Sequence, residues 1–345
     1  MKQYAGIDVS LERSSVCVVD AEGRILREGK VDSEPAAMIA WFEALGAPVE
    51  RIGLEAGPLS QWLHAEMAQA GLAVELLETR HVRNAFKTMP VKTDKKDARG
   101  IAQLMRLGWF RRVHCKSASA QEARAVLTAR KLLQTKLHDV ELSLRGVLRG
   151  FGLKVGTTSP RGYAQRIRTL VEGHAVLETI AESLLRTREV LAVELRGFER
   201  RLRSMARDDE RVRRLMTTPG VGVLVALTFV AAVDDPERFR SSRAVGPHFG
   251  LTPRKYQSGE TDYSGRISKI GDVGVRSMLY EAANVILCHP VRGSDLKTWA
   301  LAVARRAGMR KAKVALARKL AVVLHRMLRD RTTFIAHRRA PMTAA

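Results

Sequence analysis

The sequence predicts a mixed α/β segment of about one hundred residues, followed by a mainly helical remainder. Three observations lead to this prediction. Short apolar runs joined by turn residues fill the first hundred positions, and apolar residues spaced alternately three and four apart fill the middle. Near the C-terminus, an apolar run at 223–233 and a basic amphipathic stretch at 309–329 favour further helices. A chain of 345 residues is long enough for about two domains with an ample core.

The first three predicted strands form an antiparallel meander. They are Lys2–Val9, Ser14–Asp20 and Ile25–Val31, and short turns join them. Ser33, followed by Glu-Pro, predicts the start of a helix that runs to about Leu45, with Ser33 as its N-cap.

Strands and helices then alternate. We expect a strand at 50–55, a helix at 59–70 after a Gly-Pro break, a strand at 72–77 and a helix from about Lys95. This order, in which three strands are followed by a helix, a strand, a helix, a strand and a helix, is that of a ribonuclease-H-like fold. That order predicts how the chain is arranged and by itself establishes no chemistry.

Two long helices with apolar seams are predicted in the middle of the chain. The seams consist of Leu133, Leu137, Val140, Leu144 and Val147, and of Leu191, Leu195, Phe198, Leu202 and Met205. Glycines and a proline between 150 and 160 interrupt the chain between the two helices. Two arrangements fit this pattern: an antiparallel hairpin within one chain, and a coiled coil that joins two chains.

The character of the chain changes again at about Val212. The stretch Leu215–Gly222, followed by the apolar run, resembles a helix-hairpin-helix element, in which backbone N–H groups at a glycine turn bind phosphate. This makes Gly220 and Gly222 candidate nucleic-acid contacts, and an ordinary helix–helix turn is the alternative. From Ser241 to Asp272 we expect a basic loop rich in glycine and serine.

These patterns predict four regions. They are a metal-binding α/β domain at 1–115, a helical coiled-coil region at 116–211, a mainly helical C-terminal domain at 212–335 and a flexible tail at 336–345.

The charge of the chain indicates a polyanionic partner. There are 59 Lys and Arg residues against 36 Asp and Glu, which gives a net charge of +23 and a pI of about 10.7. Such a surplus suits nucleic acid, with an affinity that falls as salt rises. Aromatic residues make up only 5%, which argues against base stacking as the main source of affinity.

The cysteines and the hydropathy narrow the class further. Cys17, Cys115 and Cys288 are far apart and form no CxxC motif, so neither disulfides nor a zinc site is indicated and a reducing cytoplasm is expected. The sequence shows no N-terminal signal region and no apolar run long enough to cross a membrane. We therefore expect no membrane partner.

Four acidic residues are the candidate catalytic and metal-binding groups. Asp8 and Glu55 each end an apolar run, and Asp94 and Asp97 stand three apart at a helix start, on one helix face. Converging carboxylates can hold a metal pair that serves in-line phosphoryl displacement, and oxygen-only ligands favour Mg²⁺ or Mn²⁺. Taken singly, Asp8 is better explained as a turn residue and Glu55 as a solvated edge, and Asp94 and Asp97 could be a helix cap and a first-turn acid; only the joint pattern favours a metal site.

Basic residues surround the acidic pair and are candidate contacts to a nucleic-acid backbone. They are Lys92, Lys95, Lys96 and Arg99.

Three motifs together resemble the DEDD, RuvC-like domain of insertion-sequence transposases of the "one-ten" family. The motifs are Gly6-Ile-Asp-Val-Ser10, Gly53-Leu-Glu-Ala-Gly57 and Lys92-Thr-Asp-Lys-Lys-Asp-Ala98. Downstream, Thr217–Gly222 and Phe249–Gly271 are similar to the C-terminal transposase domain of that family. The resemblance spans nearly the whole chain, with the motifs in the family's order.

The resemblance implies a second catalytic residue, a serine nucleophile that forms a covalent phosphoserine link to DNA. The matching position is Ser258. Nearby cations are candidates to stabilise the transferred charge and to contact DNA: Arg254, Lys255, Arg266 and Lys269. A turn serine is the alternative, and other serines between 241 and 268 are chemically equivalent, so only the motif match selects Ser258.

The resemblance also implies partners. They are donor and target DNA, an element-encoded guide RNA whose base pairing selects the sequence, and further copies of the chain in a dimer or tetramer. One protomer's DEDD domain is expected to meet another's serine domain. The expected setting is the prokaryotic cytoplasm, in association with the nucleoid.

Three other functions share parts of this pattern. A RuvC-like junction resolvase would need the four acids and not Ser258. A nucleic-acid-binding remnant of a transposase would lack catalysis, which the presence of all four acids argues against. An actin-like or sugar-kinase ATPase shares the first hairpin pattern, but the sequence has no second phosphate loop and no P-loop motif.

Overall fold

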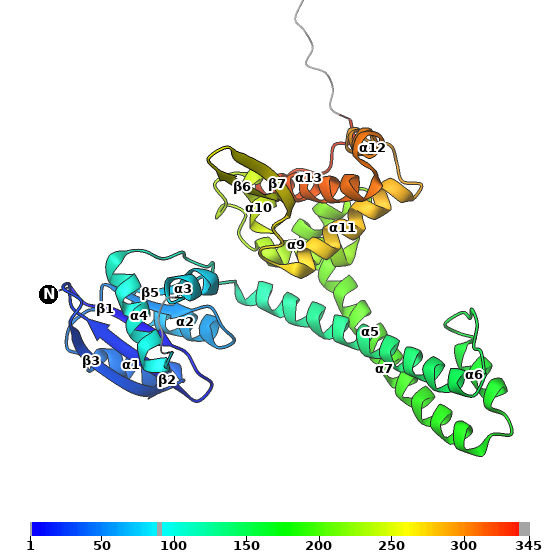
Figure 1. The fold of residues 1–345 in the computed structure, drawn as a ribbon, viewed down its shortest axis with the longest axis horizontal. Coiled ribbons are helices and arrows are strands. Elements are labelled where there is room, and N and C mark those ends of the chain that lie inside the picture. The colour runs from blue at the N-terminus through cyan, green and yellow to red at the C-terminus, as the bar shows by residue number, and fades with distance from the viewer. Residues whose placement is uncertain (1, 88–91, 338–345) are drawn as a thin grey trace, which may run out of the picture. The chain divides into compact units, whose positions relative to one another are not determined.

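The computed structural model describes residues 2–87 and 92–337, and the chain divides into two compact units, 1–116 and 117–345 (Figure 1). The first unit contains a five-stranded sheet. Its strands are β1 (Tyr4–Asp8), β2 (Arg13–Val19), β3 (Ile25–Asp32), β4 (Arg51–Glu55) and β5 (Val74–Leu77). Its helices are α1 (Pro35–Glu43), α2 (Ser60–Gln69), α3 (Thr79–Ala85) and α4 (Asp94–Leu107).

The strand order confirms the predicted topology. The sheet runs β3-β2-β1-β4-β5, with β1, β2 and β3 antiparallel and with β4 and β5 added in parallel. The order of elements is the predicted one, with the short helix α3 as an addition. Parallel pairing of β1 with β4 places the C-terminal ends of these two strands at the same edge of the sheet.

Helices cover both faces of the sheet. Met38 of α1 and Met67 of α2 pack on one face against Ile7 and Leu54. Ile101 and Met105 of α4 pack on the other face, against residues such as Tyr4 and Cys17. The alternation of side chains along β1 and β4 supplies both apolar layers.

Two glycines let α4 lie directly on the sheet. A Cβ atom at Gly6 would stand 2.2 Å from the carbonyl oxygen of Ala98 and 2.3 Å from the amide nitrogen of Ala102. A Cβ atom at Gly53 would stand 2.8 Å from the Cγ and Sδ atoms of Met105. The helix therefore approaches β1 and β4 more closely than any other residue would allow.

The predicted N-cap at Ser33 is wrong. Helix α1 begins at Pro35, and Glu34 occupies the cap position without a side-chain hydrogen bond. The Ser33 hydroxyl donates instead to the carbonyl oxygen of Ser10 at 2.7 Å and lies 2.7 Å from Ser14 Oγ. Because Ser33 is buried, its hydroxyl satisfies groups across the sheet edge and is not available to the helix.

The second unit is mainly helical. Its helices are α5 (Ala118–Gly150), α6 (Tyr163–Val171), α7 (Ala175–Asp208), α8 (Glu210–Met216), α9 (Val223–Val233), η1 (Ser242–Ala244), α10 (Val245–His248), α11 (Val273–Cys288), α12 (Asp295–Ala307) and α13 (Met309–Arg329). Its two strands are β6 (Pro253–Ser258) and β7 (Thr261–Ile267). The predicted 309–329 helix has the observed bounds.

Helices α5 and α7 pack against each other within the chain as an antiparallel pair (Figure 1). Leu144 and Leu202 of the predicted seams are buried. The seam shifts near its end, where Val147 is 37% exposed and Leu148 is buried in its place. The Arg188–Glu141 ion pair at 2.7 Å and the Arg130–Glu199 ion pair at 2.8 Å also join the helices. Of the two predicted arrangements, the structure has the hairpin within one chain.

The region predicted as a loop, 241–272, contains ordered elements. It holds η1, α10 and the hairpin β6–β7, whose strands are exposed along nearly their whole length. A sequence with few apolar residues formed this hairpin because a two-residue turn at Gly259-Glu260 joins the strands, and Gly259 has the positive φ of 55° that such a turn needs. The prediction failed because it relied on apolar alternation.

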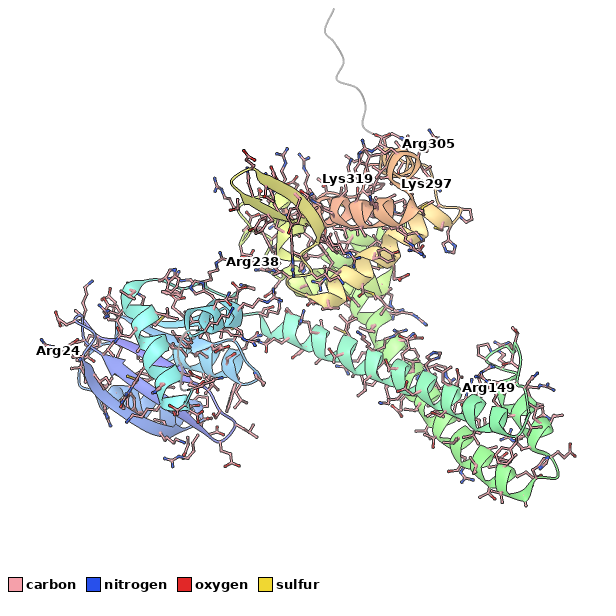
Figure 2. All side chains as sticks on the ribbon, viewed as in Figure 1. Arg24, Arg149, Arg238, Lys297, Arg305 and Lys319 are labelled. Atoms are coloured by element: carbon pink, nitrogen blue, oxygen red, sulfur yellow. The ribbon has the colours of Figure 1, made fainter. Side chains whose placement is uncertain are left out.

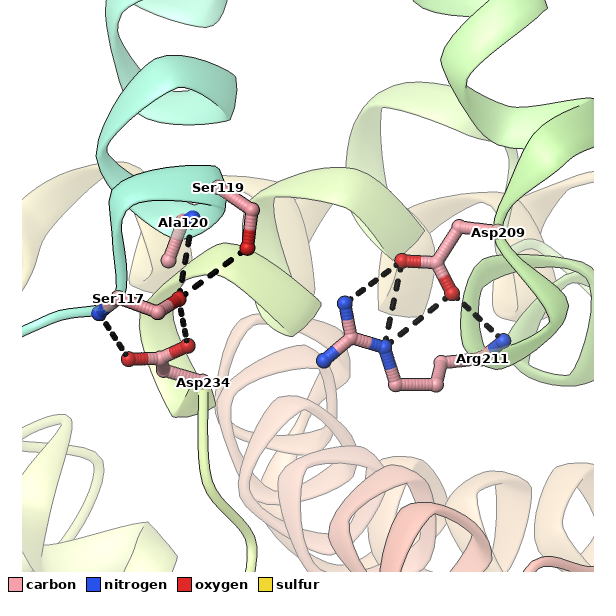
Figure 3. Close-up of polar contacts among 6 residues, drawn as sticks. All are labelled: Ser117, Ser119, Ala120, Asp209, Arg211 and Asp234. Atoms are coloured by element: carbon pink, nitrogen blue, oxygen red, sulfur yellow. Dashed lines mark hydrogen bonds and ion pairs between the residues drawn. The ribbon is translucent and has the colours of Figure 1, made fainter.

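Acidic residues fix the starts of α5 and α8 (Figure 3). Asp234 accepts hydrogen bonds from the Ser117 amide at 2.8 Å and from the Ser117 hydroxyl at 2.6 Å. Ser117 caps α5 by accepting from the Ala120 amide. At α8, Asp209 accepts from the Arg211 amide at 2.8 Å and forms an ion pair with its guanidinium.

In the described part of the chain, Cys17, Cys115 and Cys288 form no disulfide. No helix among the described residues is long and apolar enough to cross a membrane. The predicted tail falls mostly at 338–345, outside the described residues, whereas Ala336 accepts a backbone hydrogen bond from Asp295 at 3.0 Å.

Replacing Gly6 by Ala is expected to destabilise the chain by at least about 1–3 kcal/mol, because the new methyl group meets backbone atoms of α4 that cannot turn aside. Gly146→Ala is the control: Gly146 lies inside α5 with no atom within 4 Å of an added Cβ, so it should stabilise by up to about 1 kcal/mol. Urea unfolding of both variants checks the pair. Equal stability of Gly6→Ala and wild type would contradict the close approach of α4.

Candidate active site

Two of the four acids lie at adjacent strand ends. Asp8 is the last residue of β1 and Glu55 is the last residue of β4. The two strands pair in parallel, with Ile7 opposite Leu54, so both carboxylates emerge at the same edge. Since side chains alternate along a strand, each acid shares its face with the glycine two residues before it, which is the face that α4 covers.

Helix α4 brings the other two acids to this edge. Thr93 caps the helix by accepting a hydrogen bond from the Lys96 amide at 3.2 Å. Asp94 and Asp97 follow in the first turn, where the helix dipole favours negative charge. The Asp94 residue is exposed, whereas the Asp97 side chain is only 14% exposed.

The electrostatics show that the four acids act on one another. The pKa of the half-buried Asp8 is raised to about 6, first by burial and then by the charges of Asp97, Asp94 and Glu55, while Lys92 opposes them. Burial also raises the pKa of Glu55, to which Asp97 contributes, while a hydrogen bond to Thr79 and the charge of Lys92 lower it. Three distant parts of the sequence therefore share one electrostatic environment.

These donors are not gathered into a coordination shell. In residues 2–87 and 92–337, no three His, Cys, Asp or Glu side chains stand close enough together to hold a metal ion. The donor set nevertheless suits a hard divalent cation, because all four groups are carboxylates. Their mutual repulsion, visible in the raised pKa of Asp8, is the unfavourable interaction that a bound dication removes.

The cations around the acid pair have different partners. Lys92 Nζ lies 3.6 Å from Asp97 Oδ2. Lys95 and Arg99 both bind Glu28 of β3, and Arg99 Nη2 donates to Glu28 Oε2 at 2.8 Å. Within the described part of the chain, Lys96 alone of the four predicted nucleic-acid contacts has no side-chain ion pair.

Sequence reasoning missed several residues that support the site. Glu28 lies 71 positions from Arg99, and no local pattern links the two. The Arg99 and Lys95 hydrogen bonds lower the pKa of Glu28 to about 2, which identifies it as the charged anchor of α4. Gly6 and Gly53 did carry a signal, because Gly-Ile-Asp and Gly-Leu-Glu repeat a glycine two residues before the acid.

Ser258 lies in the second unit, as the last residue of β6, and not in a loop as predicted. It pairs with Thr261 of β7 and is exposed. Strand alternation places it on the same hairpin face as Tyr256 and Tyr263, whose rings stack with centroids 5.4 Å apart. These rings are 54% and 59% exposed and are the nearest aromatic groups to the serine along the hairpin.

The hairpin does not gather the four predicted cations around Ser258. Lys255 lies on the opposite face by alternation and forms an ion pair with Asp262 at 3.2 Å, and a register shift between Pro253 and Lys255 interrupts the alternation before Arg266. The Arg254 guanidinium donates to the carbonyl oxygen of Ser268 at 3.3 Å. Lys269 follows β7 at the base of the hairpin, with a positive φ of 57°.

The two glycines of the predicted phosphate-binding turn differ in their surroundings. Gly220 has a φ of 76°, and an added Cβ would stand 2.8 Å from the carbonyl oxygen of Ala282, so close packing on α11 accounts for this glycine. Gly222 is the exposed N-cap residue of α9, with no atom within 4 Å of an added Cβ. Its use as a phosphate contact stays a prediction.

Known proteins resemble the chain along its length. The transposase for insertion sequence element IS1111A of Coxiella burnetii is 28% identical over 340 residues, which cover 95% of this chain and 90% of that protein. The transposase for element IS1328 of Yersinia enterocolitica is 27% identical over 241 residues, covering 68% and 70%. The RuvC structure of Thermus thermophilus matches 32% of this chain and 99% of its own with 17% identity and a TM-score of 0.26, which is too low to support an argument.

Two family models match separate parts of the chain. A transposase model, the DEDD domain of the IS110 type, matches residues 5–152, and the model described as "Transposase IS116/IS110/IS902 family" matches residues 212–297. The first match contains the four acids and the second contains Ser258. The chain therefore belongs to the IS110/IS116 family of insertion-sequence transposases and is a DNA transposase.

Proposed function

We propose that this transposase cleaves and exchanges DNA strands with two sets of residues: a divalent-metal site at Asp8, Glu55, Asp94 and Asp97, and a nucleophile at Ser258. One observation supports the metal site above all. Burial raises the pKa of the half-buried Asp8 carboxylate, and the charges of three other acids, from β4 and α4, add to this shift, which brings the pKa to about 6. In a chain of net charge +23, four acids that act on one another in this way are typical of a functional site.

The chain's own contribution to the metal site is rigidity and orientation. Asp8 and Glu55 extend from paired strands, and Asp97 from a helix that packs on those strands, so their backbones are held in place. A bound Mg²⁺ or Mn²⁺ pair would polarise the phosphodiester and stabilise the oxygens that attack and leave. Lys92, 3.6 Å from Asp97, would exchange that contact for a DNA phosphate.

We propose a covalent step at Ser258. Its Oγ would lose a proton and attack the phosphorus of a DNA phosphodiester, forming an Oγ–P bond while one P–O bond to a sugar breaks. The departing sugar oxygen takes up a proton. Attack on the phosphoserine by a hydroxyl of a second strand reverses these changes and releases Ser258. The number of phosphoester bonds is conserved throughout, so the exchange requires no external energy source.

Further copies of the chain and a guide RNA complete the proposal. Apolar side chains point outward from the α5–α7 pair, among them Leu132 at 57% exposure, Val176 at 72% and Val190 at 62%. Such residues on a helical pair support association of protomers through these helices. The guide RNA follows from the family resemblance and from the high positive charge, which suits backbone contacts to two kinds of nucleic acid.

Cleavage by metal-activated water alone, as in a junction resolvase, is a second candidate. One observation favours it: two of the cations predicted to assist Ser258 bind other groups, since Lys255 pairs with Asp262 on the opposite face of the hairpin and Arg254 donates to the carbonyl oxygen of Ser268. This candidate needs the four acids and leaves Ser258 without a role.

Asp97→Asn is expected to reduce metal-dependent strand cleavage by at least about 100-fold, the size of loss that follows removal of one electrostatic contact to a transition state. DNA binding in EDTA should be retained or slightly stronger, because the variant lacks a carboxylate that repels DNA phosphates. Asp32→Asn, the same change at the exposed end of β3, is the control and should retain activity. Wild-type cleavage by the Asp97→Asn protein would reject the metal site.

Ser258→Ala is expected to abolish strand exchange and the covalent protein–DNA adduct, which survives denaturation and is seen as a shifted band on a denaturing gel. Ser264→Ala, on the opposite face of the same hairpin, is the control and should keep the adduct. Full cleavage by Ser258→Ala would favour the metal-only candidate and remove the serine from the mechanism.

Metal affinity is expected to rise with pH through about 6. Below that pH, Asp8 carries a proton that a metal ion must displace, so the apparent Kd for Mn²⁺ should change about tenfold per pH unit. In the metal-free protein, the raised pKa of Asp8 makes the free energy of unfolding fall as the pH rises. The contribution of Asp8 to stability is fully present below its ordinary pKa of 3.8 and is lost as the pH rises through about 6. Calorimetric titration between pH 5 and 8 measures the affinity, and Asp8→Asn should flatten its dependence.

A further inference from the structure

A groove with a volume of 920 Å³ lies between the hairpin β6–β7 and helix α13. One wall comes from β7 and the segment after it, through Ser264, Arg266 and Lys269, and the other comes from α13. Trp299 of α12 also lines it. Neither the acid quartet nor Ser258 is part of this groove.

The groove is strongly positive. Six cations line it, and no Asp or Glu does: Arg266, Lys269, Arg310, Lys311, Arg318 and Lys319. Figure 2 labels Lys319 on α13, and its Nζ lies 3.9 Å from the centre of the Trp299 ring. The other five cations form no ion pair with any residue in the described part of the chain. Their charge is therefore available to a polyanion.

The floor of the groove is apolar. Leu251, Ile267, Val314 and Val322 line it between the cations. A DNA duplex presents phosphates and hides its base faces by stacking, so it would gain nothing from an apolar floor. A single strand presents phosphates together with unpaired bases, whose faces gain by contact with apolar groups. Cations beside apolar residues therefore match a single strand better than a duplex.

We propose that this groove binds a single-stranded segment of nucleic acid. The proposal deepens the function proposed above, because strand exchange requires separated strands, and it assigns a role to the basic face of α13. The groove is also near the serine. Ser258 pairs with Thr261, and Ser264, which lines the groove, lies three residues from Thr261, or about 10 Å along β7. Helix α13 and Trp299 lie beyond the residues that the family models match, 5–152 and 212–297.

Fluorescence anisotropy of the full chain tests the proposal. The probes are labelled oligo-dT, oligo-U and a DNA hairpin duplex, in EDTA and with Ser258→Ala, so that the result does not depend on catalysis. The variant is Arg310→Ala/Lys311→Ala. The matched control is Arg305→Ala/Arg306→Ala, which removes the same charge from exposed positions of α12 outside the groove (Figure 2 labels Arg305).

The groove variant should bind single strands at least about tenfold more weakly, and the slope of log affinity against log salt should fall by about 1.4, which is two phosphate contacts at about 0.7 each. The control variant should keep wild-type values. Val314→Gln, which makes the floor polar without changing charge, should weaken single-strand binding and leave duplex binding unchanged.

Loss for oligo-dT alone or oligo-U alone would support the proposal and identify the bound strand as DNA or RNA. Equal loss in the groove variant and its control would overturn it, since charge anywhere on the unit would then suffice. Duplex binding that falls as much as single-strand binding would also overturn it. Unchanged binding in the groove variant would also overturn the proposal, and a protein partner would then be the remaining candidate for the groove. None of these results depends on whether Ser258 or the acid quartet is catalytic.

Discussion

The first unit depends on the direct contact between the backbone of α4 and the sheet. Gly6 lacks the Cβ atom that would collide with the backbone of α4 at Ala98, so the helix backbone lies directly on β1, and Gly53 leaves the space on β4 that the Met105 side chain fills. The same strands end two residues later in Asp8 and Glu55, on the face that the helix covers. Geometry and chemistry are therefore coupled, because the contact that closes the core also brings the first turn of α4 to the acids at the sheet edge.

Gathering these acids opposes folding, and the structure shows how the opposition is limited. Lys92 lies beside Asp97, and the helix dipole favours the two acids of the first turn. Glu28 holds Lys95 and Arg99, so the cations that fix the helix do not neutralise the site. Burial and the remaining repulsion together raise the pKa of Asp8, and a bound dication would relieve the repulsion. In this chain, electrostatic repulsion within the first unit and occupation of the proposed metal site would therefore be linked.

Local patterns predicted the elements well where they reflect burial, and failed where distant residues decide. The strands of the first unit and helix α13 follow apolar runs, and the structure confirms them. The prediction of Ser33 as a helix cap is wrong because its hydroxyl binds Ser10, which is 23 positions away in the sequence and gives no local signal. A two-residue turn and a tyrosine stack stabilise the hairpin that carries Ser258. Because the hairpin has no apolar face, the apolar pattern predicted a loop there. The four acids could be predicted as a set, but their separation in space and the anchoring role of Glu28 could not.

The stacked tyrosines have a consequence for how the hairpin behaves. Every residue of β6 is exposed, and a two-stranded ribbon without a buried face is only marginally stable in water. The free energy that orders this ribbon is therefore small, and any molecule that touches it contributes a comparable amount. Order at Ser258, the proposed nucleophile, would then depend on whether a nucleic acid occupies the ribbon, and slower hydrogen exchange of the β6 amides on DNA binding would reveal this linkage.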